Sequence, residues 1–155
     1  MKRSVVITVL CMGSFLSGCA AARPSNLGVR EGRLALCPKN PNCVSSQSTD
    51  VAHAVAPLIY TGTAADAVAS LKQIIKGMKR AVVVEATATY LHIEFTSALF
   101  RFIDDVEFIV DDAEKKIHVR SASRIGYSDL GVNRRRVERI SQAWDERRGP
   151  QSVDR

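Results

Sequence analysis

Four short segments with the composition of β-strands follow one another between residues 81 and 123, and the links between them are too short to hold helices. Within the second segment apolar and polar residues alternate, which is the pattern of a strand with one covered face and one solvent-exposed face. Links this short favour antiparallel hairpins. The chain therefore predicts a meander of four strands, with PLIY (57–60) as a further strand at its edge. The four segments are AVVVEA (81–86), YLHIEF (90–95), FIDDVEFIV (102–110) and KIHVRSAS (116–123).

Helical patterns flank the strands on both sides. Thr63 and Asp66 form a capping box of the T-x-x-D kind, which opens a helix. An apolar stripe at helical spacing continues this helix through about residue 79 and consists of Val68, Leu71, Ile75 and Met78. A second stripe predicts a last helix over roughly 132–147 and consists of Val137, Ile140 and Trp144. We expect an α+β fold of two layers, an antiparallel meander sheet of four to five strands with the N-side helix and the C-terminal helix packed on one face.

The register of the last hairpin follows from keeping its apolar residues together. Pairing Val110 with Ile117 leaves the apolar side chains of both strands on a common face, and a slip of one residue would scatter them. The same register sets Glu107 opposite Arg120 on the other face. It predicts a cross-strand ion pair between them, worth less than about 1 kcal/mol if it is exposed.

Asp104 is unusual because alternation places it on the core-facing side of its strand, opposite Ser123. A carboxylate in that position needs a charged or hydrogen-bonding partner. The candidate partners of Asp104 are Ser123, Arg124 and the arginines at the start of the last helix. Asp105 and Asp129 are further candidates for a carboxylate that pairs with those arginines. Asp104 and Asp105 point to opposite faces of the strand, so they do not form a two-carboxylate catalytic pair.

Three consecutive arginines, Arg134, Arg135 and Arg136, stand where the last helix begins. A helix start carries partial positive charge, so something negative is expected there. The three side chains point in directions about 100° apart and cannot all meet one carboxylate. We expect at least one to stay free beside the backbone N–H groups, where a guanidinium can form a phosphate or carboxylate site. The alternative is a salt-bridged helix start that holds no ligand.

The first residues have the features of an export signal. Met1-Lys2-Arg3 is a cationic start, an apolar run from Val5 to Leu16 follows, and LSGC ends at Cys19. A dozen apolar residues are too few to span a bilayer but suit a signal peptide. LSGC resembles a bacterial lipobox, in which the chain is cut before the cysteine and that thiol carries a diacylglycerol; the alternative is that Cys19 is merely another apolar residue of the signal. By resemblance to Gram-negative sorting rules, Ala20 implies the outer membrane, facing the periplasm.

These features divide the chain into four parts. We expect a lipoprotein signal peptide over 1–18, a lipidated cysteine and tether over 19–35, a single α+β domain over 36–148 and a disordered tail over 149–155. Loss of the signal would remove two cations and lower the formal net charge from +6 to +4. That modest excess suits anionic lipid headgroups, and the envelope compartment argues against nucleic acid as a partner.

Cys37 and Cys43 are the thiols that would remain in the exported domain. They lie in CPKNPNC, where prolines and asparagines favour turns. Two nearby thiols in an oxidising compartment predict a structural disulfide. The alternatives are a redox pair, which favours C-x-x-C, and a zinc site, for which further histidine or cysteine ligands are lacking nearby. We expect neither a metal nor a cofactor.

Three separated stretches resemble a known family. CPKNPNCVSSQ, RFIDDVEF and SASRIGYSDLGVNRRRVERI are similar to the domain of unknown function family numbered 1499, found in bacterial envelope proteins and plant plastids. The likeness covers roughly residues 36–141 and implies no established activity and no catalytic residue. The residues that it places in the family's characteristic stretches are Asp104, Asp105, Arg120, Ser121, Ser123, Arg124, Tyr127, Ser128, Asp129, Asn133, Arg134 and Arg135.

Three functions are consistent with these features. The first is a non-catalytic module that binds an anionic or amphiphilic envelope molecule at the Arg-rich helix start and the adjoining sheet, where a helix across a curved sheet can leave an apolar pocket. The second is a scaffold lipoprotein that docks another envelope protein. The third is a hydrolase-type enzyme, which lacks support because no serine lies in a G-x-S-x-G or S-x-x-K arrangement. We rank them in that order.

The candidate ligand-binding residues gather in two stretches of the chain. The expected partners are the lipid bilayer through acylated Cys19, an anionic small molecule or lipid headgroup, and an envelope protein. The three histidines, His53, His92 and His118, are scattered, and the last two are expected on the sheet surface. The candidate residues are Asp104, Arg120, Ser123, Arg124, Tyr127, Asp129, Asn133, Arg134, Arg135 and Arg136.

Overall fold

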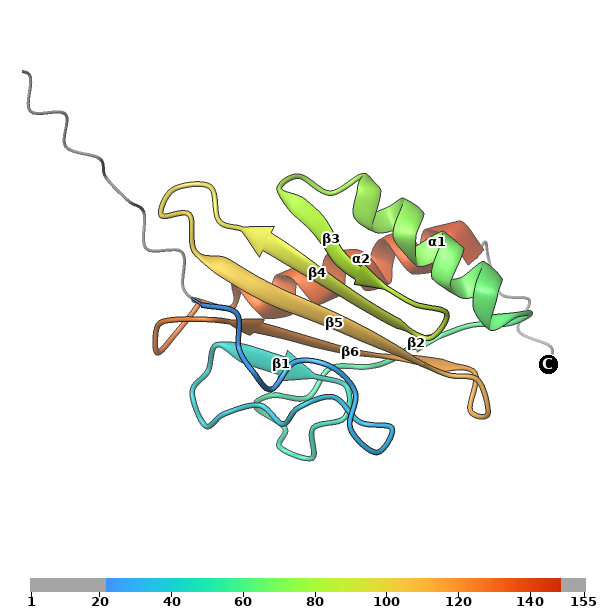
Figure 1. Ribbon diagram of the computed structural model, residues 1–155, viewed down its shortest axis with the longest axis horizontal. Coiled ribbons are helices and arrows are strands. Elements are labelled where there is room, and N and C mark those ends of the chain that lie inside the picture. Colours follow the sequence, from blue (N-terminus) through green and yellow to red (C-terminus); the bar gives the residue numbers. More distant parts are fainter. Residues whose placement is uncertain (1–21, 149–155) are drawn as a thin grey trace, which may run out of the picture.

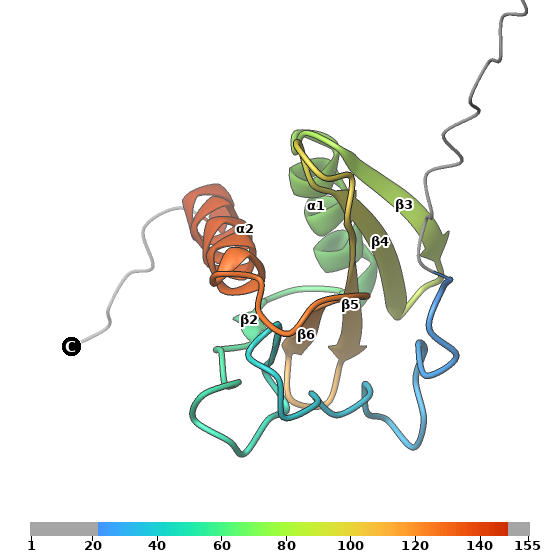
Figure 2. The same ribbon diagram turned by 90° about the vertical axis from the view of Figure 1, so that its left-hand side faces the viewer.

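The computed structural model describes residues 22–148 and arranges them as an open antiparallel sheet with two helices on one of its faces (Figures 1 and 2). The predicted α+β class is confirmed. In chain order the elements are β1 (Cys43–Ser45), β2 (Leu58–Ile59), α1 (Ala64–Lys76), β3 (Ala81–Ala86), β4 (Tyr90–Thr96), β5 (Ile103–Asp111), β6 (Lys116–Ser123) and α2 (Val132–Arg148).

The predicted meander forms the main part of the sheet. The strand order is β1-β6-β5-β4-β3, and β2 also pairs with β6, as expected for PLIY. In the β5–β6 hairpin Val110 pairs with Ile117 and Glu107 pairs with Arg120, which is the register that the apolar pattern predicts. The sheet has one strand more than the predicted maximum, because β1 lies in a stretch whose prolines and asparagines indicate only turns.

Both helices follow from local signals. At the start of α1 the Thr63 hydroxyl oxygen accepts a hydrogen bond from the Asp66 backbone N–H at 3.1 Å, so the predicted cap is present. The helix ends at Lys76, earlier than expected, because Gly77 and Met78 close it with bonds to Ile74 and Ile75. The apolar stripes of both helices pack on the core face of the sheet. The core residues that the helices contribute are Ala67, Val68, Leu71, Ile74, Ile75, Val137, Ile140 and Trp144.

The other face of the sheet, expected to be wet, is largely buried along β4, β5 and β6, whereas β3 stays mostly exposed. Residues 22–36 cross it without forming a helix or strand, on the side opposite the helices (Figure 2). Leu34 packs with Tyr90 and Ile109, and the Gly28 backbone N–H donates to a Glu107 carboxylate oxygen at 2.7 Å. The segment expected to be a tether is therefore part of the folded domain from residue 22 onward.

The covered second face corrects the placement of one histidine. His92, expected on the sheet surface, is buried, whereas His118 is half-buried with its Nδ1 3.2 Å from the Ser46 hydroxyl. Strand alternation alone showed that His92 lies on the face opposite the helices; it did not show that a segment without regular structure covers that face.

The remaining predictions for the ends of the chain fall on residues outside the described range. These are the signal peptide over 1–18, lipidation of Cys19 and the tail over 149–155. Among residues 22–148, no helix has the length and apolar character needed to cross a bilayer.

Candidate functional site

The three arginines at the start of α2 point in three directions, and each donates to an acceptor within the protein. Arg134 binds the backbone oxygens of Ala52 and Ala54, at 2.8 and 2.9 Å, and so holds the loop between β1 and β2. Arg135 donates to the Leu130 oxygen at 2.9 Å. Arg136 enters the core. The expected arginine without a protein partner is therefore not found, because the loops on either side supply carbonyl acceptors.

The negative charge at the helix start is supplied by Asp129. One of its carboxylate oxygens accepts from the Gly131 backbone N–H at 2.9 Å, and the other accepts from the Asn133 N–H at 2.6 Å. Asp129 thus occupies the position that an external anion was expected to take. Tyr127, another candidate, lies in the preceding loop and is exposed.

A buried group of side chains, called here the polar corner, joins α2 to the core face of the sheet. Arg136 donates to Asp104 at 2.5 Å, and its other terminal nitrogen donates to Ser121 and Asn133 at 3.1 and 2.6 Å. Asn133 in turn donates to Ser123 at 3.0 Å and to the backbone oxygen of Asn42 at the same distance. The polar corner brings together four of the predicted residues, Asp104, Ser123, Asn133 and Arg136. The core-facing Asp104 carboxylate thus has a partner within the protein.

Arg120 and Arg124, by contrast, lie on the opposite face of the sheet. Arg120 donates to Glu107 at 3.1 Å, so the predicted cross-strand pair forms, but it is buried instead of exposed. Glu107 also accepts from the Tyr90 hydroxyl at 2.8 Å. Burial and the neighbouring Glu107 carboxylate raise the pKa of Tyr90 far above its ordinary value.

A second buried cluster on that face surrounds Asp105. His92 Nε2 lies 2.7 Å from one Asp105 oxygen, and Arg124 donates to both oxygens at 2.8 Å. Arg124 also donates to Glu94 at 2.5 Å, and Arg23 reaches the same carboxylate oxygen at 2.7 Å. Burial by itself would raise the pKa of Asp105, but the hydrogen bonds from Arg124 and His92 outweigh it and hold that pKa below the ordinary range.

His92, Glu94 and Asp105 have the residue types of a metal site. Their ligand atoms lie within 4.8 Å of one another. However, the guanidinium of Arg124 contacts both carboxylates and already supplies the positive charge that a cation would bring. A metal would have to displace Arg124, so the donor set fits a structural ion-pair network better than a metal centre.

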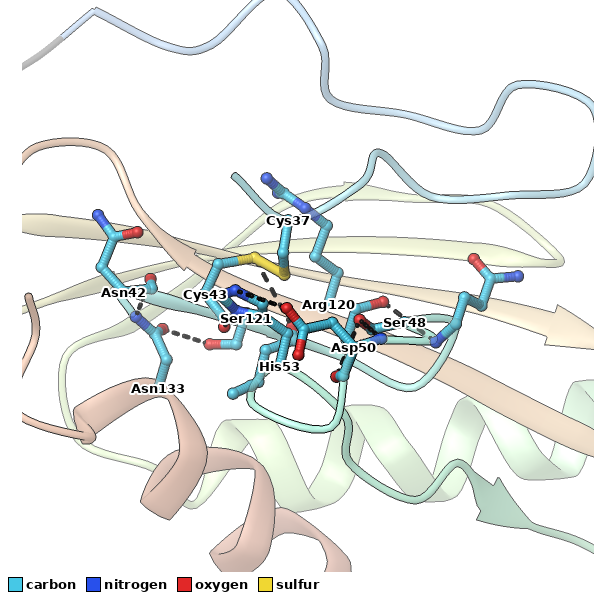
Figure 3. The surroundings of a disulfide bond; sticks show 12 residues. Cys37, Asn42, Cys43, Ser48, Asp50, His53, Arg120, Ser121 and Asn133 are labelled. Atoms are coloured by element: carbon cyan, nitrogen blue, oxygen red, sulfur yellow. Dashed lines mark hydrogen bonds and ion pairs between the residues drawn. A yellow bond between two sulfur atoms is a disulfide. The ribbon is translucent and has the colours of Figure 1, made fainter. Parts of the chain in front are cut away.

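The predicted disulfide joins Cys37 to Cys43 and lies beside the polar corner. Figure 3 shows Asn42, Ser121, Asn133 and His53 in the surroundings of the disulfide. His53 Nδ1 lies 2.8 Å from the Cys43 backbone oxygen and must donate to it, because a carbonyl oxygen only accepts. The disulfide and this bond hold β1 and the following loop against the sheet.

A groove of about 730 Å³ lies between α1, α2, the turn before β3 and the end of β4. Its volume is in the range of small-molecule sites. The apolar part of its lining, called here the floor, consists of Ile74, Met78, Phe95, Val132 and Ala143. Cationic side chains line the groove as well: Lys79, Arg80, Arg136, Arg139 and Arg147. None of the described residues that line it is acidic.

Arg136 connects the groove to the polar corner. Its guanidinium carbon lies 4.7 Å from the centre of the Phe95 ring, a cation–π distance, while Asp104 holds its far side. A second hollow, of about 480 Å³, shares Val132 and Arg139 with the groove and continues along α2. The polar corner therefore fixes one wall of a basic, partly apolar groove.

Sequence reasoning missed most of the groove. Arg139 and Arg147 were not among the candidates, although they follow Arg136 at helical spacing and so share a face of α2. Lys79 and Arg80 lie in the turn after α1, and only the packing of the two helices brings them to the same groove.

A comparison with known families matches residues 33–144 to the family described as "Protein of unknown function (DUF1499)". No curated protein and no solved structure matches the chain. The matched stretch contains β1 to β6, both cysteines of the disulfide, the polar corner and all the residues that line the groove except Arg147. Because the match spans most of the chain, the protein belongs to this family, as its three characteristic stretches predict.

Proposed function

We propose that the protein is a lipid-anchored bacterial envelope protein, and that its groove between α1 and α2 binds an anionic amphiphile without chemically changing it. The observation that carries this proposal is the lining of the groove, which combines an apolar floor with five cationic side chains and contains no acidic residue among those described. An apolar chain would contact the floor and an anionic head would bind the guanidinium groups.

The dimensions of the groove suit such a ligand. Its lining follows α2 from Val132 to Arg147, which corresponds to about 22 Å of helix axis. An extended acyl chain can lie along this length. Arg139 makes only a long bond of 3.3 Å to the Arg135 backbone oxygen, so it can turn toward a ligand head at small cost.

The location in the envelope rests on the front of the chain. A cationic start, an apolar run and the LSGC box occur together, and acylation of Cys19 would anchor the protein in a membrane. The disulfide between Cys37 and Cys43 agrees with an oxidising compartment. A membrane-anchored protein is close to a supply of anionic amphiphiles, which supports the proposed ligand class.

A fluorescent fatty acid, 11-(dansylamino)undecanoic acid, tests the groove in a titration of residues 20–155, which contain every described residue. We expect the wild type to bind it and Arg139→Glu to weaken the binding about tenfold or more, since the substitution reverses a charge in the groove. Arg30→Glu is the matched control, because Arg30 is exposed and lies in the segment on the far face of the sheet. Equal affinity in both variants, or no binding by the wild type, would contradict the proposal.

A scaffold that docks another envelope protein is the second candidate, and one observation favours it. Within residues 22–148, β3 is an edge strand that pairs only with β4, and it exposes Val82 and Val83. An edge of this kind can accept a strand from a partner. A photo-cross-linking amino acid at residue 82 tests this in cells. A single discrete adduct that is absent with the same group at residue 113 would support it, and no adduct would count against it.

A further inference from the structure

The β4–β5 loop, residues 97–102, presents large apolar side chains to solvent. Leu99 is 79% exposed and Phe100 is 68% exposed. Phe100 stacks on Phe102 with ring centroids 5.5 Å apart, so the aromatic rings form a small ordered platform. Arg101, at the tip between them, adds a cation. Aromatic, apolar and basic side chains in this combination are typical of segments that lie in a membrane interface.

The β6–α2 loop, residues 124–131, lies beside it and is similar in character. The Arg124 backbone N–H donates to the Ile103 oxygen at 3.1 Å, which joins the two loops at their bases. Leu130 is 83% exposed, and Tyr127 is exposed as well. Figure 1 shows both loops at the same end of the sheet, which is called here the loop end.

The N-terminal segment enters the fold at the loop end too. Arg23 binds the Glu94 carboxylate oxygen that also binds Arg124, and the ribbon of the described residues begins at this end in Figure 1. Cys19 precedes Ala22 by three residues, which can span at most about 11 Å. A lipid on Cys19 would therefore hold the loop end close to the membrane surface.

The groove between α1 and α2 extends to the same end. Ser97 and Ala98 of the β4–β5 loop line it, as does Val132 at the start of α2. Lys79 and Arg80 also line the groove and are exposed. An amphiphile in the bilayer leaflet next to the loop end would thus face this part of the groove directly.

We propose that the loop end rests on the bilayer, with the β4–β5 and β6–α2 loops in its interface, so that the groove opens toward lipid. The partner is a membrane surface that contains anionic lipid. The inference rests on the proposed lipid anchor at Cys19 and extends the proposed function by giving the domain an orientation. The opposite end of the sheet agrees with this orientation of the domain. There the β5–β6 turn (112–115) exposes charged residues and the small Ala113 instead of large apolar residues.

Tryptophan quenching by brominated lipid tests this orientation with the full, acylated chain in phosphatidylglycerol–phosphatidylethanolamine vesicles. Phe100→Trp places a reporter on the loop end, Tyr127→Trp places a second one on the neighbouring loop, and Ala113→Trp is the control at the opposite end. The native Trp144 is buried and bonded to Ile59, so its emission serves as an internal reference. We expect brominated acyl chains to lower the added emission at least about twofold at the loop end and to leave the control unchanged.

The outcomes separate this inference from the proposals on which it rests. Vesicle flotation and the mass of the Cys19 peptide report the anchor alone, and the dansyl titration reports the groove alone. If the anchored protein shows no quenching at either loop position, or equal quenching at residue 113, the orientation is wrong even though the anchor holds. If the protein does not float with the vesicles, the anchor is wrong and the inference is overturned with it, whereas the affinity of the groove is unaffected.

Discussion

Arg136, near the start of α2, donates to Asp104 of β5 at 2.5 Å, and each of the two residues is 5% exposed. The pair connects the last helix to the central strand of the sheet. Among the contacts of the polar corner it is the only one between oppositely charged side chains. The same guanidinium lies over Phe95 in the groove floor. A bond that holds the fold together is therefore also part of the proposed binding surface.

Removal of the carboxylate should strongly destabilise the protein. Asp104→Ala leaves the Arg136 cation buried without its counter-charge, and such changes cost about 3–5 kcal/mol. Urea denaturation at pH 7 measures the loss. Asp145→Ala is the control, since Asp145 lies on the exposed side of the same helix and its loss should change the unfolding free energy by less than about 0.5 kcal/mol. Equal effects of the two variants would show that the buried pair is not a main link between helix and sheet.

Two leucines in the N-terminal segment test whether that segment belongs to the folded domain. Leu34 is 4% exposed against Tyr90 and Ile109, whereas Leu36, two residues later, is 76% exposed. Leu34→Ala should lower the unfolding free energy by about 2–3 kcal/mol through lost burial and the cavity that remains. Leu36→Ala should change it by less than about 0.5 kcal/mol. If both are neutral in chemical denaturation, residues 22–36 do not pack stably on the sheet.

The architecture was predictable because it depends on local periodicity. The alternation in YLHIEF, the short turns and the stripe of Val137, Ile140 and Trp144 each reflect burial against a neighbouring layer, and burial determines register. Residues 22–36 lack such a period. Their contacts with the strands of the sheet are made by one leucine, one backbone N–H and one arginine, so the covered second face could not be inferred from the sequence.

The candidate site was predictable only in part, for a similar reason. Asp104 was identifiable because a charge at a core-facing strand position needs a partner, and alternation reveals such a position. Which arginine would meet it depends on the direction in which α2 leaves the sheet, and this is a tertiary property. From the sequence Arg124 was a reasonable alternative partner for Asp104. In the structure Arg136 binds Asp104, and Arg124 binds Asp105 on the other face of the sheet. The groove requires the packing of α1 against α2, which no single stretch encodes.

Loss of the disulfide should loosen the first strand before the rest of the sheet. The Cys37→Ala/Cys43→Ala double variant removes a small loop closure worth about 2 kcal/mol on the chain-entropy model. β1 has only three residues, so hydrogen exchange of the 43–45 amides should rise more than that of β5. Exchange mass spectrometry of wild type and variant makes the comparison, and dithiothreitol added to the wild type should reproduce the effect. An unchanged exchange pattern would mean that the backbone pairing of β1 with β6 suffices.

The acid sensitivity of the protein should depend on Arg124. Burial would raise the pKa values of Asp105 and Glu94, but hydrogen bonds from Arg124, with His92 and Arg23, hold them below their ordinary values of 3.8 and 4.5. The unfolded chain then takes up these protons first as the pH falls, so the stability they contribute is complete above about pH 5 and declines below that. Arg124→Gln should lower the unfolding free energy at pH 7 and make its decline between pH 5 and 3 shallower. Arg23→Gln is the control and should keep most of the decline, because it leaves both Arg124 bonds to Asp105 in place. Urea titrations across this pH range measure the unfolding free energy of each variant. Parallel curves for wild type and Arg124→Gln would assign the acid sensitivity to other carboxylates.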